Sequence, residues 1–241
     1  MRNLTLLFSF LLFFILCASF SWAESKVFNY DVSWLGIPAG KIKITVKQRD
    51  GRTKLIAKAR TIGLVRVLLP FESTWTTWLD KNGYPRRSRI LRIERGKKTL
   101  KEYIYDQQNG VVEKYRNGKH EKTIKLKKYP VHDELSAFYA SMGLCFKAPG
   151  EEKSLLIFAK NKANEARLKY LKDEKEKTPC GRLKAKKIAV TFGFQSELIE
   201  RSKKALLWVA QNMVVKGEGK LTLGHITAKL SNCPSKEEKS K

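Results

Sequence analysis

The sequence predicts a mainly β protein, in which one antiparallel sheet forms a barrel, half-barrel or sandwich and one central amphipathic helix packs on the sheet. Three observations support this prediction. Apolar and polar residues alternate along most of the chain. Turn-forming pairs such as Asp50-Gly51, Asn82-Gly83 and Asn117-Gly118 recur between the alternating segments. A single segment near residue 140 changes from the period of a strand to that of a helix.

The first strand illustrates the alternation. Phe28, Tyr30, Val32 and Trp34 occupy every second position and are separated by polar residues, as in a strand with one buried face. Similar segments follow at short intervals as far as the C-terminus. The expected strands span residues 28–34, 42–46, 53–62, 71–79, 87–95, 99–106, 111–116, 120–127, 153–160, 164–172, 182–194, 203–211 and 220–231.

The helix is expected between His132 and Phe146. Four apolar residues there share one helical face, at spacings of three, four and seven: Leu135, Phe138, Tyr139 and Met142. Asp133 is a suitable N-cap and Gly143 weakens the last turn. Because this face is apolar, it must be buried against a sheet, and the concave side of a curved sheet would accept it.

The N-terminus predicts export. Arg2 supplies a positive charge, residues 6–16 are apolar except for Ser9, and Ser21 and Ala23 provide small residues at a cleavage site. A membrane anchor is the alternative, but the apolar run is shorter than the ~20 residues that a spanning helix needs. We therefore expect a cleaved signal peptide over 1–23, one β-rich domain over 24–232 and a disordered charged tail over 233–241. The mature protein would be periplasmic or otherwise exported.

The charge of the chain is strongly positive. The whole sequence has a net formal charge of +26, and Arg2 is the only charged residue of the leader, so the mature chain carries +25. Export argues against nucleic acid as the partner and leaves anionic lipids, wall polymers or acidic proteins. The alternative is a charged surface that serves only solubility, and the sequence leaves both interpretations open.

No motif in the chain indicates catalysis or a metal. His132, Asp133 and Ser136 contain the residue types of a hydrolase triad, but they suit the start of a helix equally well. The histidines lack the spacing of metal ligands, and we expect no cofactor and no metal. Of the cysteines outside the leader, Cys180 in a turn and Cys233 after the last strand are the pair that we expect to form a disulfide.

Two groups of residues could form a lipid site. Aromatic and apolar side chains from the first strands and the helix could line an apolar cavity, although they could equally be ordinary core. These are Trp34, Phe71, Trp75, Trp78, Phe138 and Met142. Arginines of one expected strand could bind an anionic head group, because their guanidinium groups match phosphate geometry. These are Arg86, Arg87, Arg89 and Arg92.

Four segments also stand out by their order and spacing. They are Phe28-x-Tyr30-x-Val32-x-Trp34-x-Gly36-Ile37-x-Ala39-Gly40, Asp133-Glu134-Leu135-Ser136-Ala137-Phe138-Tyr139, Thr178-Pro179-Cys180-Gly181, and Trp208 in a late strand. Together they resemble an exported β-rich family known as domain of unknown function 3108. The chain departs from the family pattern after the Trp208 strand, where Met213-Val214-Val215 replaces an expected Pro-Val pair. The resemblance implies an envelope protein with a single antiparallel β domain and implies no reaction.

We expect a non-enzymatic envelope protein that binds an apolar or lipid-like ligand with an anionic head group. The first alternative is an interaction module that docks a basic face on a membrane, a wall polymer or an acidic protein. The second alternative is an enzyme of an undetected type. The sequence does not predict an oligomeric state.

Overall fold

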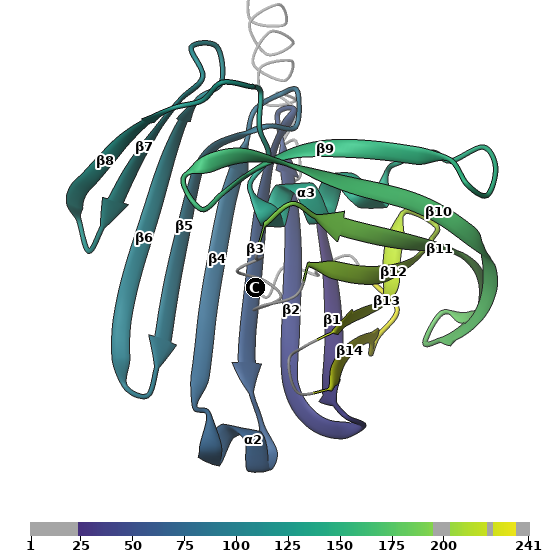
Figure 1. Ribbon diagram of the computed structural model, residues 1–241. Coiled ribbons are helices and arrows are strands. Elements are labelled where there is room, and N and C mark those ends of the chain that lie inside the picture. Colours follow the sequence, from purple (N-terminus) through teal and green to yellow (C-terminus); the bar gives the residue numbers. More distant parts are fainter. Residues whose placement is uncertain (1–23, 195–202, 221–223, 235–241) are drawn as a thin grey trace, which may run out of the picture.

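The computed structural model describes residues 24–194, 203–220 and 224–234 (Figure 1). The expected signal peptide over 1–23 and most of the expected tail, 235–241, lie outside the described residues. The described chain forms one antiparallel sheet of fourteen strands in the order β8-β7-β6-β5-β4-β3-β2-β1-β14-β13-β12-β11-β10-β9. The predicted mainly β fold with one antiparallel sheet is confirmed, and the sheet is an open half-barrel because its edge strands β8 and β9 do not pair with each other.

The N-terminal half of the sheet is a continuous meander. Its strands are β1 (Glu24–Trp34), β2 (Ile37–Arg49), β3 (Arg52–Thr61), β4 (Phe71–Leu79), β5 (Pro85–Glu94), β6 (Lys97–Asp106), β7 (Val111–Arg116) and β8 (Lys119–Lys125). Tight turns at Asp50-Gly51 and Asn117-Gly118 join neighbours, and these residues adopt the positive φ angles that such turns require. The turn signals in the sequence therefore mark the strand boundaries correctly.

The C-terminal half is a second meander that returns to β1. Its strands are β9 (Glu152–Ala159), β10 (Lys162–Thr178), β11 (Gly181–Phe192), β12 (Lys204–Ala210), β13 (Met213–Lys220) and β14 (His225–Leu230). The expected strand over 220–231 was wrong in its boundaries. Gly217-Glu218-Gly219, which lies outside the expected strands, is part of β13, because glycine is tolerated in a strand whose neighbours on both sides supply the pairing.

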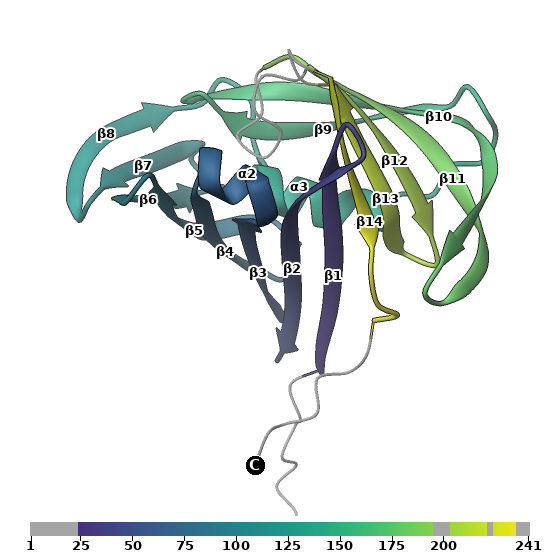
Figure 2. The same ribbon diagram turned by 90° about the horizontal axis from the view of Figure 1, so that it is seen from below.

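The first and last strands of the domain are neighbours. Tyr30 pairs with Leu230 and Trp34 with Ile226, so β1 and β14 join the two halves into one sheet. The Asn232 side chain accepts a 2.9 Å hydrogen bond from the Asn29 backbone N–H and fixes this junction at its end. The start and the end of the described chain consequently lie at the same end of the sheet (Figure 2).

The helix α3 (Glu134–Met142) lies within the curvature of the sheet (Figures 1 and 2). Asp133 caps it: Oδ1 accepts from the Ser136 backbone N–H at 2.6 Å, and the Ser136 hydroxyl accepts from the Asp133 backbone N–H at 3.0 Å. The helix is shorter than the predicted 132–146 because it ends before Gly143, and Cys145 lies in the loop that follows. The predicted packing of this helix against the sheet is confirmed.

The chain just before α3 connects the two edges of the sheet. The backbone N–H of His132 donates to the Leu156 carbonyl at 2.8 Å, and the Phe158 N–H donates to the His132 carbonyl at 2.7 Å. Val131 is buried beside Phe158 and Ile124. The half-barrel is therefore bridged at one end by this short segment and by apolar contacts.

A second helix, α2 (Gly63–Leu68), connects β3 to β4. No element was expected between the strands over 53–62 and 71–79. None of its residues is buried, and it forms the lowest point of the molecule in Figure 1. No helix among the described residues is long and apolar enough to cross a membrane.

Candidate functional site

A half-enclosed cavity of about 80 Å³ lies between α3 and the strands β9–β12. The cavity exists because small side chains line it on both sides: Ala137 on the helix, and Ala166 and Ala205 on the sheet. The remaining lining is almost wholly apolar and comprises Phe138, Leu155, Ile157, Leu168, Val190, Phe192 and Leu207, with Glu134 and Ser141 as the polar exceptions. The cavity therefore suits an apolar group.

The strand next to the cavity lacks side chains at two positions on the same face. Gly217 of β13 pairs with Leu207, and Gly219 pairs with Ala205. Directly paired residues point to the same side of a sheet, so nothing projects from β13 beside these two lining residues. The inner face of β13 therefore carries no side chain of its own at these two positions.

A buried polar cluster holds the start of α3. Asp133 is 1% exposed, and its Oδ2 accepts hydrogen bonds from the Thr77 hydroxyl at 2.5 Å and from the Trp75 indole N–H at 3.3 Å. Its other oxygen caps the helix. Since each carboxylate oxygen has at least one donor, Asp133 is a well-satisfied anchor between β4 and α3.

His132 lies beside this cluster and is only 8% exposed. Its ring stacks on Tyr84 with 4.7 Å between the centroids. Burial lowers the pKa of His132, and the nearby Asp133 and Asp80 partly oppose this shift. Within the described part of the chain, its Nδ1 is the one buried side-chain nitrogen or oxygen without a hydrogen-bond partner. The ring is therefore stacked on Tyr84, and its burial favours the neutral form.

The hydrolase residue set is not assembled as a triad. Ser136 is 1% exposed, and its hydroxyl donates to the Asp133 backbone carbonyl at 3.2 Å while it accepts the capping hydrogen bond. A nucleophile must contact a base and face a substrate, and this hydroxyl does neither. The interpretation of these residues as a helix start is the one that agrees with the geometry.

Of the six apolar residues expected at a ligand site, only Phe138 lines the cavity. Met142 belongs to the adjoining core with Leu168 and Val190. Trp75 lies in the central core and donates to Asp133. Alternation along β4 puts Trp78 on the opposite face from Trp75, with Lys54 and Arg87 over its ring.

The other two aromatic residues lie near the end of the sheet that carries α2. Phe71 begins β4 directly after the α2 connection, and the Arg92 guanidinium lies 5.5 Å from its ring centre. Trp34 ends β1 and pairs with Ile37 across the first hairpin. The sequence showed which residues are apolar, whereas only the tertiary packing shows which of them border empty space.

The four arginines do not converge on one point. Along β5, Arg87 and Arg89 share one face, whereas Arg92 shares the other face with the buried Ser88 and Ile90. Arg86 is exposed and has no direct partner in β4, because Trp78 pairs with Arg87 and Leu79 pairs with Pro85. Arg87 also forms an ion pair with Glu102. The alternation that places residues on a strand therefore divides the predicted head-group cluster between two surfaces.

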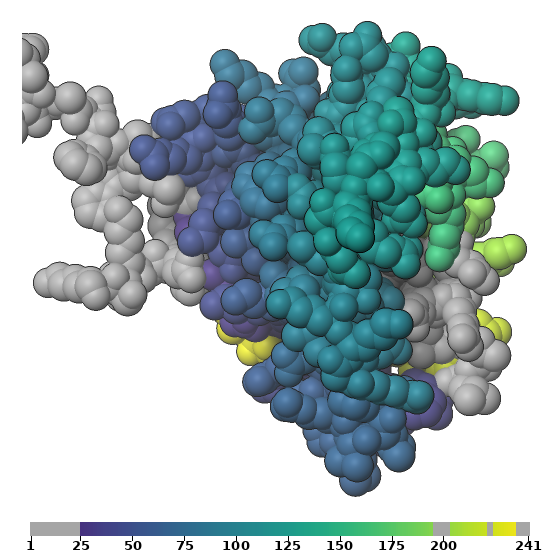
Figure 3. Space-filling view, turned by 90° about the vertical axis from the view of Figure 1, so that its left-hand side faces the viewer, coloured from purple at the N-terminus to yellow at the C-terminus, as the bar shows by residue number. Residues whose placement is uncertain are grey.

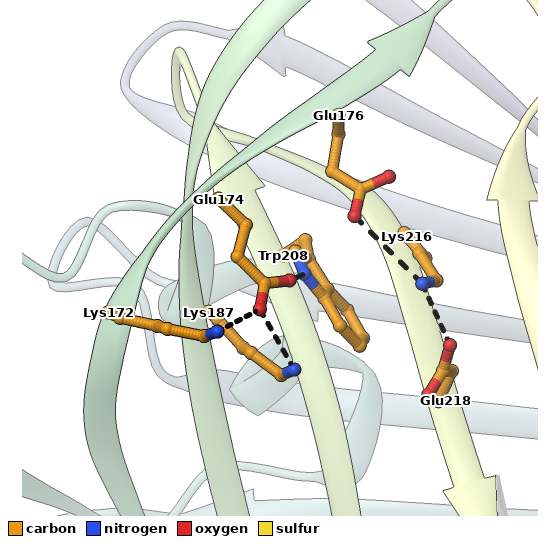
Figure 4. A network of polar contacts seen from close by, with 7 residues as sticks. All are labelled: Lys172, Glu174, Glu176, Lys187, Trp208, Lys216 and Glu218. Atoms are coloured by element: carbon orange, nitrogen blue, oxygen red, sulfur yellow. Dashed lines mark hydrogen bonds and ion pairs between the residues drawn. The ribbon is translucent and has the colours of Figure 1, made fainter.

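A further polar network, absent from the sequence reasoning, surrounds Trp208 (Figure 4). Its indole N–H donates to Glu174 at 2.6 Å, across the intervening strand β11. Lys172 and Lys187 contact the other oxygen of Glu174 at 3.0 and 3.1 Å. The Trp208 hydrogen bond first, and the two lysines after it, lower the pKa of Glu174 to about 2.

Cations also cover the faces of this indole ring. The Nζ of Lys187 lies 4.9 Å and that of Lys216 4.0 Å from the ring centre. Lys216 continues the network to Glu218 at 2.8 Å and Glu176 at 3.9 Å (Figure 4). Because Trp208 and Leu207 are consecutive in β12 and lie on opposite faces, this network joins β10, β11 and β12 on the side away from Leu207 and the cavity. The run of mixed acidic and basic residues over 172–177 was the available signal.

Cys180 at the tip of this hairpin is joined to Cys233 by a disulfide, with 5.0 Å between the Cα atoms. This is the pair expected from the sequence. Cys145 is a free and exposed thiol. Among the residues that the structure describes, no group of three or more His, Cys, Asp or Glu side chains is placed to hold a metal ion.

These features define a class of protein: an open, barrel-like antiparallel sheet wrapped around one helix, with an apolar cavity beneath that helix. The chain belongs to the family described as protein of unknown function (DUF3108), whose model matches residues 29–231. None of the curated proteins compared with this chain matches it.

Three solved structures resemble this chain to different degrees. The beta-barrel-like protein of domain of unknown function DUF1849 from Brucella abortus is 9% identical, with a TM-score of 0.56 over 90% of this chain and 98% of that one. A DUF1089 family protein from Pseudomonas aeruginosa is 13% identical, with a TM-score of 0.39 over 73% and 88% of the two chains. A Bacteroides fragilis protein with a YmcC-like fold, predicted to be exported, is 12% identical, with a TM-score of 0.35 over 88% and 95%. The likeness to the Brucella protein shows a shared barrel-like fold.

Proposed function

We propose that this protein is an exported, non-enzymatic component of the cell envelope that binds the apolar chain of a lipid-like ligand beneath α3. The cavity between α3 and β9–β12 carries this proposal, because its walls are almost wholly apolar and small residues keep it open. Apolar pockets with few polar groups are typical of lipid and other small-molecule sites.

The size of the cavity limits what it holds. Its volume of about 80 Å³ is roughly half that of an apolar cavity of ~150 Å³ that accepts benzene. It therefore suits the end of an acyl chain rather than a whole lipid. The rest of the chain would leave along the inner face of β13, where Gly217 and Gly219 present no side chain.

The proposed ligand is anionic. The mature chain carries a formal charge of +25, which attracts anionic amphiphiles and disfavours cationic ones. Arg87 and Arg89 lie on one face of β5 and Arg92 lies on the other, so they do not form one cluster. This arrangement favours attraction of the anionic ligand by the overall positive field of the protein. Nucleic acid is not part of the proposal, because the proposed export would take the chain out of the cytoplasm.

Export and the absence of catalysis are parts of the same proposal. The leader pattern over 1–23 and the Cys180–Cys233 disulfide both support an oxidising compartment. The use of Ser136 in a buried capping box supports a binding role over hydrolysis.

The test is native mass spectrometry, with lipid extraction, of protein purified from an envelope fraction and then incubated with palmitic acid or phosphatidylglycerol. We expect a bound lipid in the wild type. Ala205→Leu fills the cavity with an isobutyl group and should remove that lipid while the protein stays folded. Ala163→Leu is the matched control, because Ala163 lies on β10 against a different core cluster, beside Tyr105 and Phe158.

Two results would overturn the proposal. One is a lipid-free mass that stays unchanged after incubation with both probes. The other is lipid binding that Ala205→Leu and Ala163→Leu retain equally. Either result would direct attention to the interaction-module alternative, in which the basic surface binds a partner in a strongly salt-dependent manner.

A further inference from the structure

The end of the molecule formed by α2 exposes an unusual amount of apolar surface. Leu64, Val67 and Leu68 are 75%, 79% and 71% exposed, and Leu69 directly after the helix is 50% exposed. Soluble proteins seldom present such residues side by side unless the surface has a partner. The blue segment at the bottom of Figure 3 shows that this end projects from the body of the molecule.

The first hairpin extends the same apolar surface. Leu35 and Ile37, at the turn between β1 and β2, are 53% and 52% exposed. The Ile62 N–H, just before α2, donates to the Ala39 carbonyl at 3.0 Å and holds the two connections together. We call these residues the α2 tip: Leu35, Ile37, Leu64, Val67, Leu68 and Leu69.

The α2 tip is held in place by hydrogen bonds while its side chains face outward. The Thr61 hydroxyl donates to the Leu69 carbonyl at 2.9 Å, and the Phe71 N–H donates to the Thr61 hydroxyl oxygen at 3.1 Å. Leu35 has a φ of +51°, a conformation that leucine seldom adopts. One edge of its side chain covers Gly224, and half of the residue remains in solvent. The apolar exposure is therefore a feature of an ordered loop.

Positive charge surrounds the α2 tip. The basic residues at this end of the sheet are exposed: Lys41, Arg60, Arg66, Arg95, Lys97 and Lys98. The Arg95 N–H donates to the Pro70 carbonyl at 3.1 Å, so the turn before Lys97 lies directly beside the α2 connection. Two of the few acidic residues here are already paired, Glu72 with Arg66 and Asp31 with Lys41.

An apolar point within a basic ring has the composition of a membrane-surface anchor. Such elements bury their apolar side chains ~5–10 Å into the boundary between head groups and acyl chains, while their cations contact anionic lipids. Trp34, beside Ile37, adds a residue type that favours this boundary. A flat or concave patch would suit a protein partner better than this projecting point does.

We propose that the α2 tip inserts into the surface of an anionic lipid bilayer and so docks the protein on a membrane. Strand β1 runs from Glu24 to Trp34, which lies beside Ile37 of the α2 tip, so the docked molecule would direct the start of the described chain away from the bilayer. This inference rests on different residues from those of the cavity and stands independently of it.

The test is co-sedimentation with vesicles of phosphatidylcholine, with and without phosphatidylglycerol, using protein purified from the envelope fraction. We expect binding to the mixed vesicles. A triple variant, Leu64→Ser/Val67→Ser/Leu68→Ser, should reduce the partition coefficient by about tenfold or more, because it removes most of the apolar surface. Val67→Trp should show a blue shift of its fluorescence on the same vesicles.

The matched control is Ile104→Ser/Leu171→Ser, which removes two exposed apolar residues elsewhere, 43% and 38% exposed. It should bind vesicles like the wild type, and so should the cavity variant Ala205→Leu. No binding by the wild type, or undiminished binding by the triple variant, would overturn the proposal. A wild-type dimer that becomes monomeric only in the triple variant would also overturn it, because a second copy of the chain would then cover the α2 tip.

Discussion

The hydroxyl of Thr77 donates a 2.5 Å hydrogen bond to the carboxylate of Asp133 and joins the middle of β4 to the first turn of α3. Both residues are buried, with exposed fractions of 0% and 1%. The Trp75 indole shares the same carboxylate oxygen. One acidic side chain therefore fixes the position of the helix that covers the cavity.

Removal of this carboxylate should destabilise the protein strongly. Asp133→Ala leaves the buried donors of Thr77, Trp75 and the Ser136 backbone without an acceptor, so we expect a loss of about 3–5 kcal/mol in the free energy of unfolding. Thr77→Val removes one donor and should cost about 1.5–3 kcal/mol. Urea unfolding at neutral pH measures both values.

The control is Thr76→Val, which changes a residue on the opposite face of β4. Its free energy of unfolding should lie within about 0.5 kcal/mol of the wild-type value. An Asp133→Ala protein as stable as this control would show that Asp133 does not anchor α3.

Glu174 should make stability depend on acidic pH. Its pKa in the folded protein is about 2, below the ~4.3 of an unfolded chain. A lowered carboxyl pKa stabilises the folded state fully above the unfolded value, and this contribution is lost as the pH falls through 4 toward 2. We expect Glu174→Gln to be less stable than the wild type at pH 7, with a difference that shrinks by pH 3.

Urea unfolding at several pH values between 7 and 3 provides this comparison. Glu165→Gln on the same strand is the control, because its ion pair with Arg167 is exposed and should contribute little. A difference between wild type and Glu174→Gln that stays constant with pH would contradict the proposed role of the Trp208 hydrogen bond.

The disulfide should stabilise the domain by restricting its unfolded state. Cys180 and Cys233 are 53 residues apart, and closure of a loop of this length corresponds to about 4 kcal/mol at most in the chain-entropy account. We expect Cys180→Ser to lower the free energy of unfolding by about 2–4 kcal/mol. The stability of this variant should no longer depend on dithiothreitol. Cys145→Ser should leave both properties unchanged, since Cys145 is free and exposed. Equal stability of oxidised and reduced wild type would contradict this prediction.

Cleavage of the leader gives a direct prediction of mass. Protein recovered from the host envelope should begin at Glu24, because Ser21 and Ala23 provide the small residues that signal peptidase requires. Intact mass and N-terminal sequencing would show this. An N-terminus at Met1 in membrane-bound material would instead support the anchor alternative.

Local sequence patterns predicted most strands because alternation and turn residues are local signals. The period of Leu135, Phe138 and Met142 likewise revealed α3, and Asp133 revealed its cap. The same patterns misplaced β13, since Gly217 and Gly219 are typical of turns and only pairing with β12 and β14 keeps them extended. The helix α2 was not predicted, because its apolar residues face solvent. The apolar periodicity that reveals a helix arises from a buried face, which α2 lacks.

The binding features were harder to predict because they depend on contacts between distant segments. Nothing in the sequence distinguishes Ala205, beside a void, from Ala185, which is packed in the core. Four arginines in one strand appeared to form a cluster, yet alternation separates Arg87 from Arg92. Trp208 was noticed as a late tryptophan, and only the folded hairpin shows that Glu174 is its partner.

The pairing of β1 with β14 has a consequence for the order of folding. Tyr30 and Leu230 are partners in the complete sheet, yet they lie almost at opposite ends of the described chain. Because β1 comes first in the sequence and β14 last, one edge of β1 stays unpaired until the final strand is available. Contacts of such long range slow folding and leave an exposed strand edge in the meantime. The sheet is complete only once nearly the whole polypeptide is available for folding, and the step that completes it is the insertion of β14 between β1 and β13.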